Sequence, residues 1–341
     1  MNRRTLISML AAAGSWTAMR DVFAADPKAP ALTVDGRAAR FGVYLGAGCT
    51  GSKKLVGYEA WLGRRVDQVI EFLSWEVLRK RMTWGVSCWK KAGRQVVYSL
   101  PMLPPDRSAT LAQGANGRFD DLYRHYAELL VRAGYSQSII RIGWEFNAKW
   151  YAWDASQDPE AWIAYWRRIA STMRGVPGAA FKFDWCPAAS AKGFVADRAY
   201  PGDDVVDIVG LDYYNTTIDK KADTPELRWQ ARMNMQHGLK WQRDFARSHR
   251  KPMSLPEWGT GVHKQWGGPP DDPYFIDGMA DWIENNAVAY HGYWEHKSKD
   301  YATRMADGSQ PKASAEFRRR FGGSNVSSEA SPLQPITRRM V

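Results

Sequence analysis

Residues 139–175 read IIRIGWEFNAKWYAWDASQDPEAWIAYWRRIASTMRG, and this stretch indicates how the chain folds. It opens with a β-branched and aromatic run, 139–145, which is typical of a buried strand. Asp158 and Pro159 then form a cap and first-turn pair that begins a helix, and apolar residues recur at helical spacing as far as Gly175. A second short apolar run, 180–186, follows. The order strand, helix, strand predicts a parallel pair joined by a crossover helix.

The same alternation extends in both directions along the chain. Eight strand-like runs occur, at residues 41–46, 66–72, 96–100, 139–145, 180–186, 206–213, 253–257 and 288–294. Helical patterns separate them, and the clearest span residues 120–133, 159–175, 224–248, 273–286 and 313–321. Eight such units fit a closed barrel, which needs roughly 250 residues, better than a doubly wound sheet. We therefore predict an α/β protein with a single (β/α)₈ barrel, a TIM barrel, over residues 25–322.

Composition and charge exclude several other classes of protein. The chain has 341 residues, of which 45% are hydrophobic and 24% are charged, as in an ordinary globular protein. Its net charge is +11, but the two ends carry more than half of it, and no basic stripe runs through the middle. We expect no nucleic-acid partner. Outside the N-terminus no run of 18 apolar residues occurs, so we expect no membrane span.

The two ends of the chain differ in composition from the part between them. Arg3 and Arg4 precede a short apolar run, and Val22-Phe23-Ala24 places small residues at a cleavage site. Residues 1–24 are therefore predicted to be a signal peptide with a twin-arginine pattern, and the protein periplasmic or secreted. The alternative is an apolar N-terminal helix of the fold. Residues 323–341 are polar, rich in Ser and Pro, and basic, which predicts a disordered tail.

Three cysteines leave the redox pattern open. Cys49 and Cys88 could form a disulfide in an oxidising compartment, with Cys186 buried, but three unpaired thiols are an equal alternative. Their spacing does not indicate a metal site, and we expect no metal and no cofactor.

Two glutamates stand out because of where their strands end. In this fold function lies at the carboxyl ends of the strands. The fourth predicted strand ends in Glu145, and the seventh ends in Glu257. A pair of carboxylates is what cleavage of a glycosidic bond requires, because one donates a proton to the leaving oxygen while the other attacks or activates water.

The sequence around these glutamates resembles glycoside hydrolase family 26, the β-mannanase group of the large clan of barrels with catalytic residues on strands four and seven. RIGWEFNAKWYAW at 141–153 is similar to the strand-four signature, with Arg141 four residues before the acid/base Glu145 and Trp150 five after it. YPGDDVVDIVGLDYYN is similar to strand six, and KPMSLPEWG to strand seven with the nucleophile. Trp144 stands where the family usually has a histidine, which indicates a distant relative with another substrate.

The resemblance implies a retaining endo-β-glycosidase that hydrolyses a polysaccharide. Glu145 is expected to be the general acid and then the base, with a raised pKa, and Glu257 the nucleophile, held ionised by Arg141 and Tyr214. Residues 141, 143 and 145 share one face of an extended strand, so an inward Glu145 makes Arg141 inward too. Residues expected to bind the substrate are Arg141, Trp144, Trp150, Trp153, Trp185, Asp212, Tyr214, Trp258 and Trp294. Trp144 alternates away from Glu145, so a packing role is equally open for it.

Two other functions remain open at this point. A catalytically silent sugar-binding barrel would keep the aromatic cleft without turnover. A transglycosylase would use the same site but pass the sugar to another sugar rather than to water. In each case the partner is a polysaccharide or oligosaccharide, and we expect a monomer.

Overall fold

The computed structural model describes residues 38–190, 192–217 and 223–323. The predicted signal peptide, 1–24, lies outside these residues, as does the predicted tail apart from residue 323. Within them, no helix is long and apolar enough to cross a membrane.

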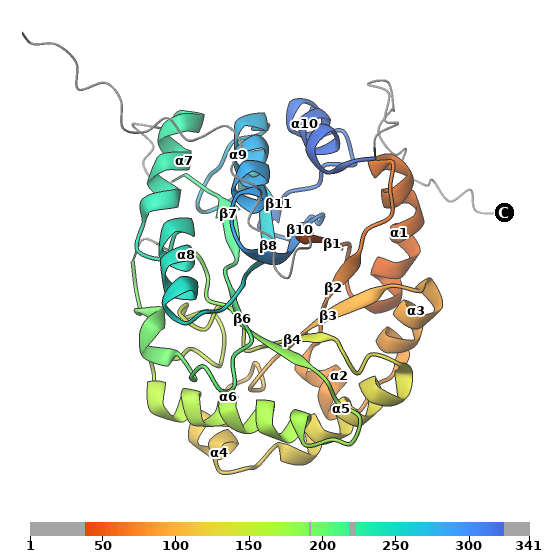
Figure 1. Cartoon of the computed structure of the whole chain (residues 1–341), viewed down its shortest axis with the longest axis vertical. Helices are drawn as coiled ribbons and strands as arrows, with labels where there is room; N and C mark the ends of the chain where they lie inside the picture. The colour runs from red at the N-terminus through yellow and green to blue at the C-terminus, as the bar shows by residue number, and fades with distance from the viewer. Residues whose placement is uncertain (1–37, 191, 218–222, 324–341) are drawn as a thin grey trace, which may run out of the picture. The chain divides into compact units, whose positions relative to one another are not determined.

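Eight parallel strands close into a barrel, as predicted (Figure 1). They are β1 (Arg40–Tyr44), β2 (Gln68–Phe72), β3 (Gln95–Leu100), β4 (Ile139–Ile142), β5 (Lys182–Trp185), β6 (Ile208–Gly210), β8 (Met253–Thr260) and β10 (Val288–Trp294). Neighbouring strands pair in sequence order, and β10 pairs in parallel with both β8 and β1, which closes the ring. The short strand β7 (Tyr213–Asn215) follows β6 and pairs further along β8.

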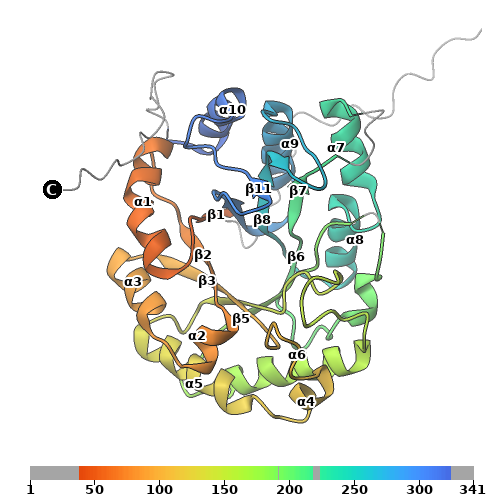
Figure 2. The ribbon, with the colours of Figure 1, turned by 180° about the vertical axis from the view of Figure 1, so that it is seen from behind.

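Helices surround this barrel on the outside, as Figures 1 and 2 show. They are α1 (Gly48–Leu62), α2 (Trp75–Arg79), α3 (Trp84–Ala92), α4 (Leu111–Ala115), α5 (Asp120–Ala133), α6 (Pro159–Arg174), α7 (Pro225–Asn234), α8 (Leu239–Ser248), α9 (Pro273–Glu284) and α10 (Pro311–Phe321), with a 3₁₀ turn, η1 (Ala196–Ala199). The Asp158 side chain accepts a hydrogen bond from the Ala161 amide, so it caps α6 as the sequence predicted.

One predicted helix is wrong. Residues 224–248 form two helices, α7 and α8, rather than one. The chain turns at Gly238, where a Cβ atom would lie only 2.4 Å from the Arg232 carbonyl oxygen. A residue with a side chain could not pass so close to the end of α7, and the break sends α8 back along the barrel.

The core has two parts, one inside the barrel and one outside. Inside, the ring is filled by a small cluster that comprises Ile70, Val97, Ile139, Ile208 and Tyr290. A much larger cluster lies between the strands and the helices. Cys49 and Cys88 form a disulfide between α1 and α3, while Cys186 is free and buried. Of the two alternatives open from the sequence, the bridge is therefore the one found.

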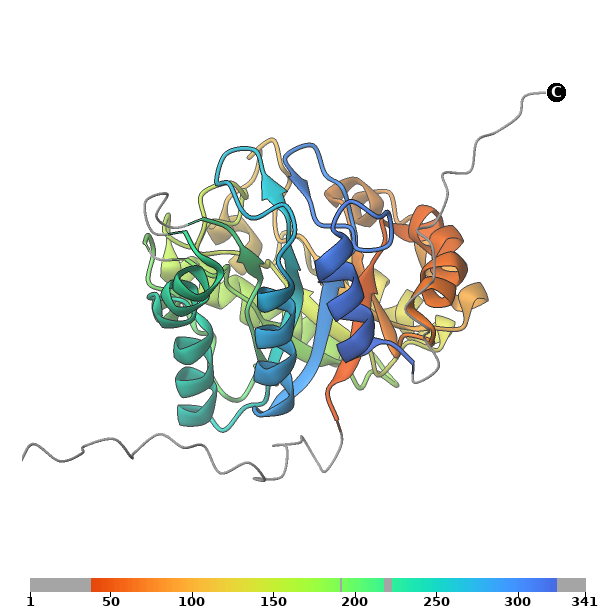
Figure 3. The same cartoon turned by 90° about the horizontal axis from the view of Figure 1, so that it is seen from above.

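A small two-stranded sheet extends beyond the carboxyl ends of the last strands (Figure 3). It consists of β9 (Val262–His263) and β11 (Tyr301–Ala302), which pair antiparallel. The two segments come from the loops after β8 and β10. This small sheet therefore adds a wall to the end of the barrel where function was expected.

Candidate active site

A cleft opens at the carboxyl ends of the strands, with a volume of about 490 Å³. Its lining comes from β7, from β8 and β10, from helix α7, and from the loops after β4, β5, β6, β8 and β10. Both predicted catalytic residues, Glu145 and Glu257, line it, together with Asp212 and Tyr214. The sequence-predicted pair therefore shares one cavity.

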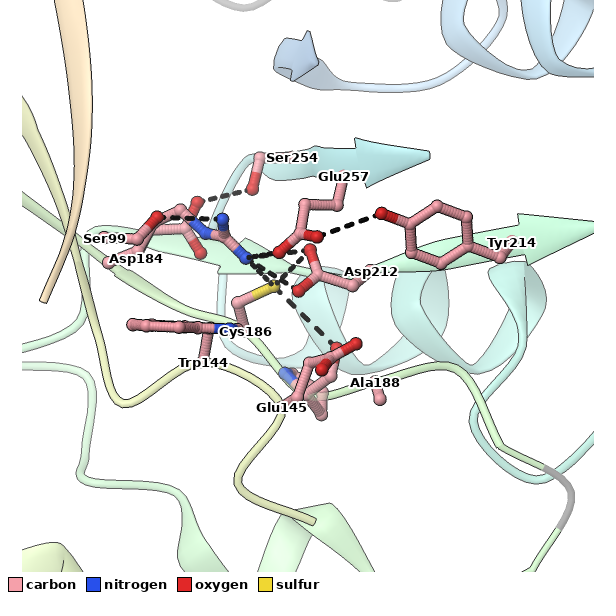
Figure 4. A network of polar contacts seen from close by, with 12 residues as sticks. Ser99, Trp144, Glu145, Asp184, Cys186, Ala188, Asp212, Tyr214, Ser254 and Glu257 are labelled. Atoms are coloured by element: carbon pink, nitrogen blue, oxygen red, sulfur yellow. Dashed lines mark hydrogen bonds and ion pairs between the residues drawn. The ribbon is translucent and has the colours of Figure 1, made fainter. Parts of the chain in front are cut away.

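Arg141 connects the carboxylates of Asp212 and Glu257 at the floor of this cleft. Figure 4 shows these two carboxylates beside Tyr214. Nη2 of Arg141 donates to both oxygens of Asp212, at 2.8 and 2.7 Å, and to Oε1 of Glu257 at 3.2 Å. The Tyr214 hydroxyl donates to the other oxygen of Glu257 at 3.0 Å. Glu257 thus accepts two hydrogen bonds, one of them from a cation, and both stabilise a negative charge on it.

Further polar groups hold Arg141 in place from below. Its Nη1 donates to the Ser99 hydroxyl at 3.0 Å. The Cys186 thiol lies 3.4 Å from Nη2 and donates to Asp212 at 3.3 Å. Arg141 and Asp212 are both fully buried, so their charges depend on each other for compensation. This arrangement fixes the position of the floor before any substrate binds.

Glu145 is placed differently from what the sequence predicted. Strand β4 ends at Ile142, and both Gly143 and Glu145 have positive φ, +56° and +52°. The predicted strand to residue 145 is therefore wrong, and alternation along a strand does not explain the direction of Glu145. A tight turn does, and it is anchored by the Glu145 amide, which donates to the Cys186 carbonyl at 2.8 Å. A non-glycine residue in this region of backbone space is strained, as is common at functional sites.

The Glu145 carboxyl has few partners. Among the residues that the structure describes, one side-chain hydrogen bond reaches it, from Nε1 of Trp150 to Oε2 at 3.0 Å. Burial, followed by the negative charge of Glu257, raises its pKa to about 8. The carboxyl is therefore protonated at neutral pH and can donate a proton.

The tryptophans predicted to bind the substrate divide into two groups. Trp150 and Trp294 line the cleft, and Trp294 stacks on Tyr44 with ring centroids 4.1 Å apart. Trp185 and Trp258 are fully buried instead, and their indole N–H groups donate to the Ala199 carbonyl and to His291. For these two the predicted contact with the substrate is wrong. Each follows an inward residue on its strand, so alternation turns it toward the helices.

Trp144 and Trp153 also lie behind the cleft rather than in it. Trp153 stacks on Tyr151 with centroids 4.5 Å apart, and Trp144 donates from Nε1 to the Tyr151 hydroxyl at 2.9 Å. The prediction that they touch substrate is wrong, and of the two roles left open for Trp144 the packing role is found. Arg141 is likewise not a lining residue, because it is fully buried beneath Asp212 and Glu257.

Several lining residues were not predicted. Tyr151, Thr216, Arg232, His263 and Tyr301 all face the cleft. Tyr151 lies inside the strand-four signature and could have been singled out there. Arg232 and Tyr301 could not have been singled out, because neither belongs to a motif. Helix α7 and the two-stranded sheet of β9 and β11 bring them to the cleft.

Among the described residues, no group of three or more His, Cys, Asp or Glu could hold a metal ion.

Residues 136–227 match the model of glycosyl hydrolase family 26. The chain resembles this family. The match confirms the predicted resemblance and the predicted enzyme class, a glycoside hydrolase that acts on O-glycosyl bonds. It covers β4 to β6 and therefore includes Arg141, Glu145 and Asp212. No curated protein matches the sequence significantly.

Solved structures of glycoside hydrolases share the fold at low sequence identity. A family 26 β-mannanase from Bacteroides ovatus is 16% identical, with a TM-score of 0.59 over 88% of this chain and 95% of that one. An endo-β-1,4-mannanase double mutant from Cellulomonas fimi is 17% identical, with a TM-score of 0.61 over 85% of this chain and 73% of that one. An endo-β-1,4-mannanase catalytic domain from a Bacillus species is 18% identical, with a TM-score of 0.54 over 76% and 77%. These likenesses establish the barrel fold.

Proposed function

We propose that this glycoside hydrolase is a retaining endo-β-glycosidase that hydrolyses a polysaccharide by double displacement. The observation that carries the proposal is that two glutamates line one cleft in opposite electrostatic surroundings. Glu257 accepts hydrogen bonds from Arg141 and Tyr214, whereas burial raises the pKa of Glu145 to about 8. One is suited to carry a negative charge and the other a proton.

In the first step Glu257 attacks the anomeric carbon while Glu145 gives its proton to the glycosidic oxygen. The C–O bond to the leaving sugar breaks as the bond to the Glu257 oxygen forms, which yields a glycosyl ester. Glu145 is then ionised. It takes a proton from water, the oxygen of that water attacks the anomeric carbon, and the ester bond breaks to release Glu257. Two inversions retain the β configuration.

The surrounding side chains support binding of a sugar chain. Trp150 and Trp266 are 52% and 46% exposed, and together with Trp294 they present aromatic faces to the cleft. Such faces pack against the C–H groups of pyranose rings. Asp212 also lines the cleft, where its buried carboxylate pairs with Arg141 beside Glu257 and so supports the nucleophile.

The Cys49–Cys88 disulfide supports a periplasmic or secreted location, because such bridges persist in oxidising compartments. We propose that the protein acts there as a monomer, after removal of its signal peptide.

The test has two parts. A panel of β-mannan, β-xylan, mixed-linkage β-glucan and bacterial exopolysaccharides, assayed for new reducing ends, identifies a cleaved polymer. NMR of the first product then gives its anomeric configuration, and mass spectrometry after reaction with a 2-deoxy-2-fluoro glycoside of the same sugar locates the covalent adduct. We expect a β product and an adduct on Glu257. An α product, or an adduct elsewhere, would overturn the mechanism.

A further inference from the structure

Two buried arginines on helix α7 differ in the charge of their hydrogen-bond partners. Arg228 is buried and forms ion pairs with Asp223 and Asp272, both at 2.6 Å. Arg232, one helical turn further on, is also buried, with 6% of its surface exposed, but it faces the cleft. Among the described residues no carboxylate forms an ion pair with it. Within the described part of the chain, its guanidinium donates to the Thr216 carbonyl and hydroxyl alone, at 3.3 and 2.7 Å, both through Nη1.

A second polar group without a partner lies on the same part of the cleft. The Tyr301 hydroxyl is buried and lines the cleft, yet it has no hydrogen-bond partner among the described residues, and neither has Nε of Arg232. Both side chains line this one cleft. Tyr301 packs edge-on against Tyr214, with ring centroids 5.2 Å apart. Because Tyr214 donates to Glu257, Tyr301 lies near the predicted nucleophile.

A buried cation without a counter-charge is costly unless a ligand supplies one. A guanidinium remains charged at any physiological pH and matches a carboxylate in shape as well as in charge. Neutral sugar hydroxyls would satisfy the hydrogen bonds but leave the positive charge uncompensated. The carboxylates of the cleft itself, Glu145, Asp212, Glu257 and Asp300, do not pair with Arg232.

We propose that Arg232 and Tyr301 bind the carboxylate of an acidic sugar residue, so that the substrate is a carboxylated polysaccharide. This inference rests on the proposed function, since it assigns a substrate class to the same cleft. The charge at the entrance of the cleft also favours an acidic substrate. Lys264, Lys297 and Lys299 are exposed on the loops that also supply His263, Ser298 and Asp300 to the cleft, and none forms an ion pair with a described residue. Positive charge at a cleft entrance attracts an anionic polymer.

The experiment compares polymers that differ only in the carboxylate. Alginate, gellan, xanthan and glucuronoxylan are each assayed beside a carboxyl-reduced form, in which the uronate has become a neutral sugar with the same linkages. We measure kcat/KM on both forms for the wild type, Arg232→Gln and Tyr301→Phe. Arg132→Gln, on the exposed face of α5, is the control for loss of a positive charge elsewhere.

For at least one pair we expect the wild type to prefer the carboxylated form by about tenfold or more, since hydrogen bonds to charged groups are the strong ones. Arg232→Gln should lower that preference about tenfold, mainly through KM, and Arg132→Gln should not alter it. Tyr301→Phe should lower it about threefold, because it removes one hydroxyl. It keeps the aromatic ring, so it serves as the second variant if loss of Arg232 unfolds α7, which thermal unfolding would reveal.

The contrary results are equally clear. Equal or better cleavage of the reduced polymers by the wild type would overturn the inference, and so would an Arg232→Gln preference equal to that of the wild type. Cleavage confined to neutral mannan, xylan or glucan would also overturn it and leave the proposed function standing. Failure to cleave any polymer, neutral or acidic, would count against the proposed function itself.

Discussion

Glu145 and Glu257 are the same residue type in one cleft, yet their supports differ. Glu257 lies within the eight-residue strand β8, which pairs with β6 on one side and β10 on the other. Glu145 lies in a turn just after β4, with its backbone in the left-handed region. The first side chain is fixed by the sheet and by two hydrogen-bond donors, and the second by a strained turn and one exposed indole.

This difference shows how a barrel gives one residue type two tasks. A nucleophile must be ionised and aimed, which a regular strand and the buried Arg141 provide. A general acid must hold a proton at neutral pH, which requires burial with few donors. The surroundings, rather than the residue type, therefore assign the roles.

The comparison predicts its largest effect at Glu257. Glu257→Ala should lower kcat at least about 10⁴-fold, because the covalent path disappears with the nucleophile. Oligosaccharide binding should persist, since aromatic packing does not depend on this carboxylate. Reducing-end assays and calorimetric titration measure the two quantities on a confirmed substrate. Turnover by Glu257→Ala at the wild-type rate would reject Glu257 as the nucleophile. If the wild type itself bound glycans but cleaved none, a catalytically inactive sugar-binding barrel would be the better account.

Glu145→Ala should lower hydrolysis of the natural polymer by about 10²–10⁴-fold, the usual contribution of proton transfer. Formation of the glycosyl ester from activated aryl glycosides should fall less, because their leaving groups depart without a proton. Azide should then accept the sugar and give a β-glycosyl azide, since that anion needs no base. Product analysis by NMR checks this. If azide rescued Glu257→Ala with a β product instead, the two roles would have to be exchanged.

Arg141→Met should destabilise the fold by about 3–5 kcal/mol, because it leaves buried carboxylates without their cation. Urea denaturation at pH 7 measures this change. The matched control is Arg167→Met, whose pair with Asp204 is 40% and 64% exposed and should contribute less than about 1 kcal/mol. Equal losses in the two variants would contradict the view that the buried network fixes the floor of the site.

The raised pKa of Glu145 predicts that both activity and stability fall as the pH rises, over different pH ranges. Polymer hydrolysis should decline as the pH rises through about 8, where the general acid loses its proton. The folded protein holds a proton that the unfolded chain has released above pH 4.5, so this carboxyl reduces stability as the pH rises from there to about 8. Glu145→Gln should therefore raise the melting temperature more at pH 8 than at pH 4. A pH-independent difference would refute this.

The smallest effect is expected at Trp150. Its indole N–H donates to Glu145 and so lowers the pKa of that carboxyl against the larger effect of burial. Trp150→Phe keeps an aromatic face but removes this donor, so the alkaline limb of activity should move to higher pH. The pH profile of kcat/KM measures the shift. A limb that moved to lower pH would show that the donor acts on another group.

Much of the architecture was predictable because short-range patterns carry it. The eight β-branched runs correspond to the barrel strands, and the Asp158-Pro159 pair does begin α6. The errors occur where one residue breaks a pattern. Gly238 divides the predicted helix 224–248. Strand β4 ends at Ile142, three residues before Glu145, because Gly143 has a positive φ.

For the site, the sequence predicted that Glu145, Glu257, Asp212 and Tyr214 would lie together, because their strands end at the same edge of the barrel. The family resemblance added Arg141. The sequence did not separate the tryptophans that line the cleft from Trp144, Trp153, Trp185 and Trp258, because hydrophobic rings suit a sugar face and a core equally well. Nor did it predict that Arg232 and Tyr301 line the cleft, which they reach through helix α7 and the two-stranded sheet of β9 and β11. The sequence shows which residue types are present, but which buried charge lacks an ion pair among the described residues depends on segments far apart in sequence, and only the tertiary structure decides that.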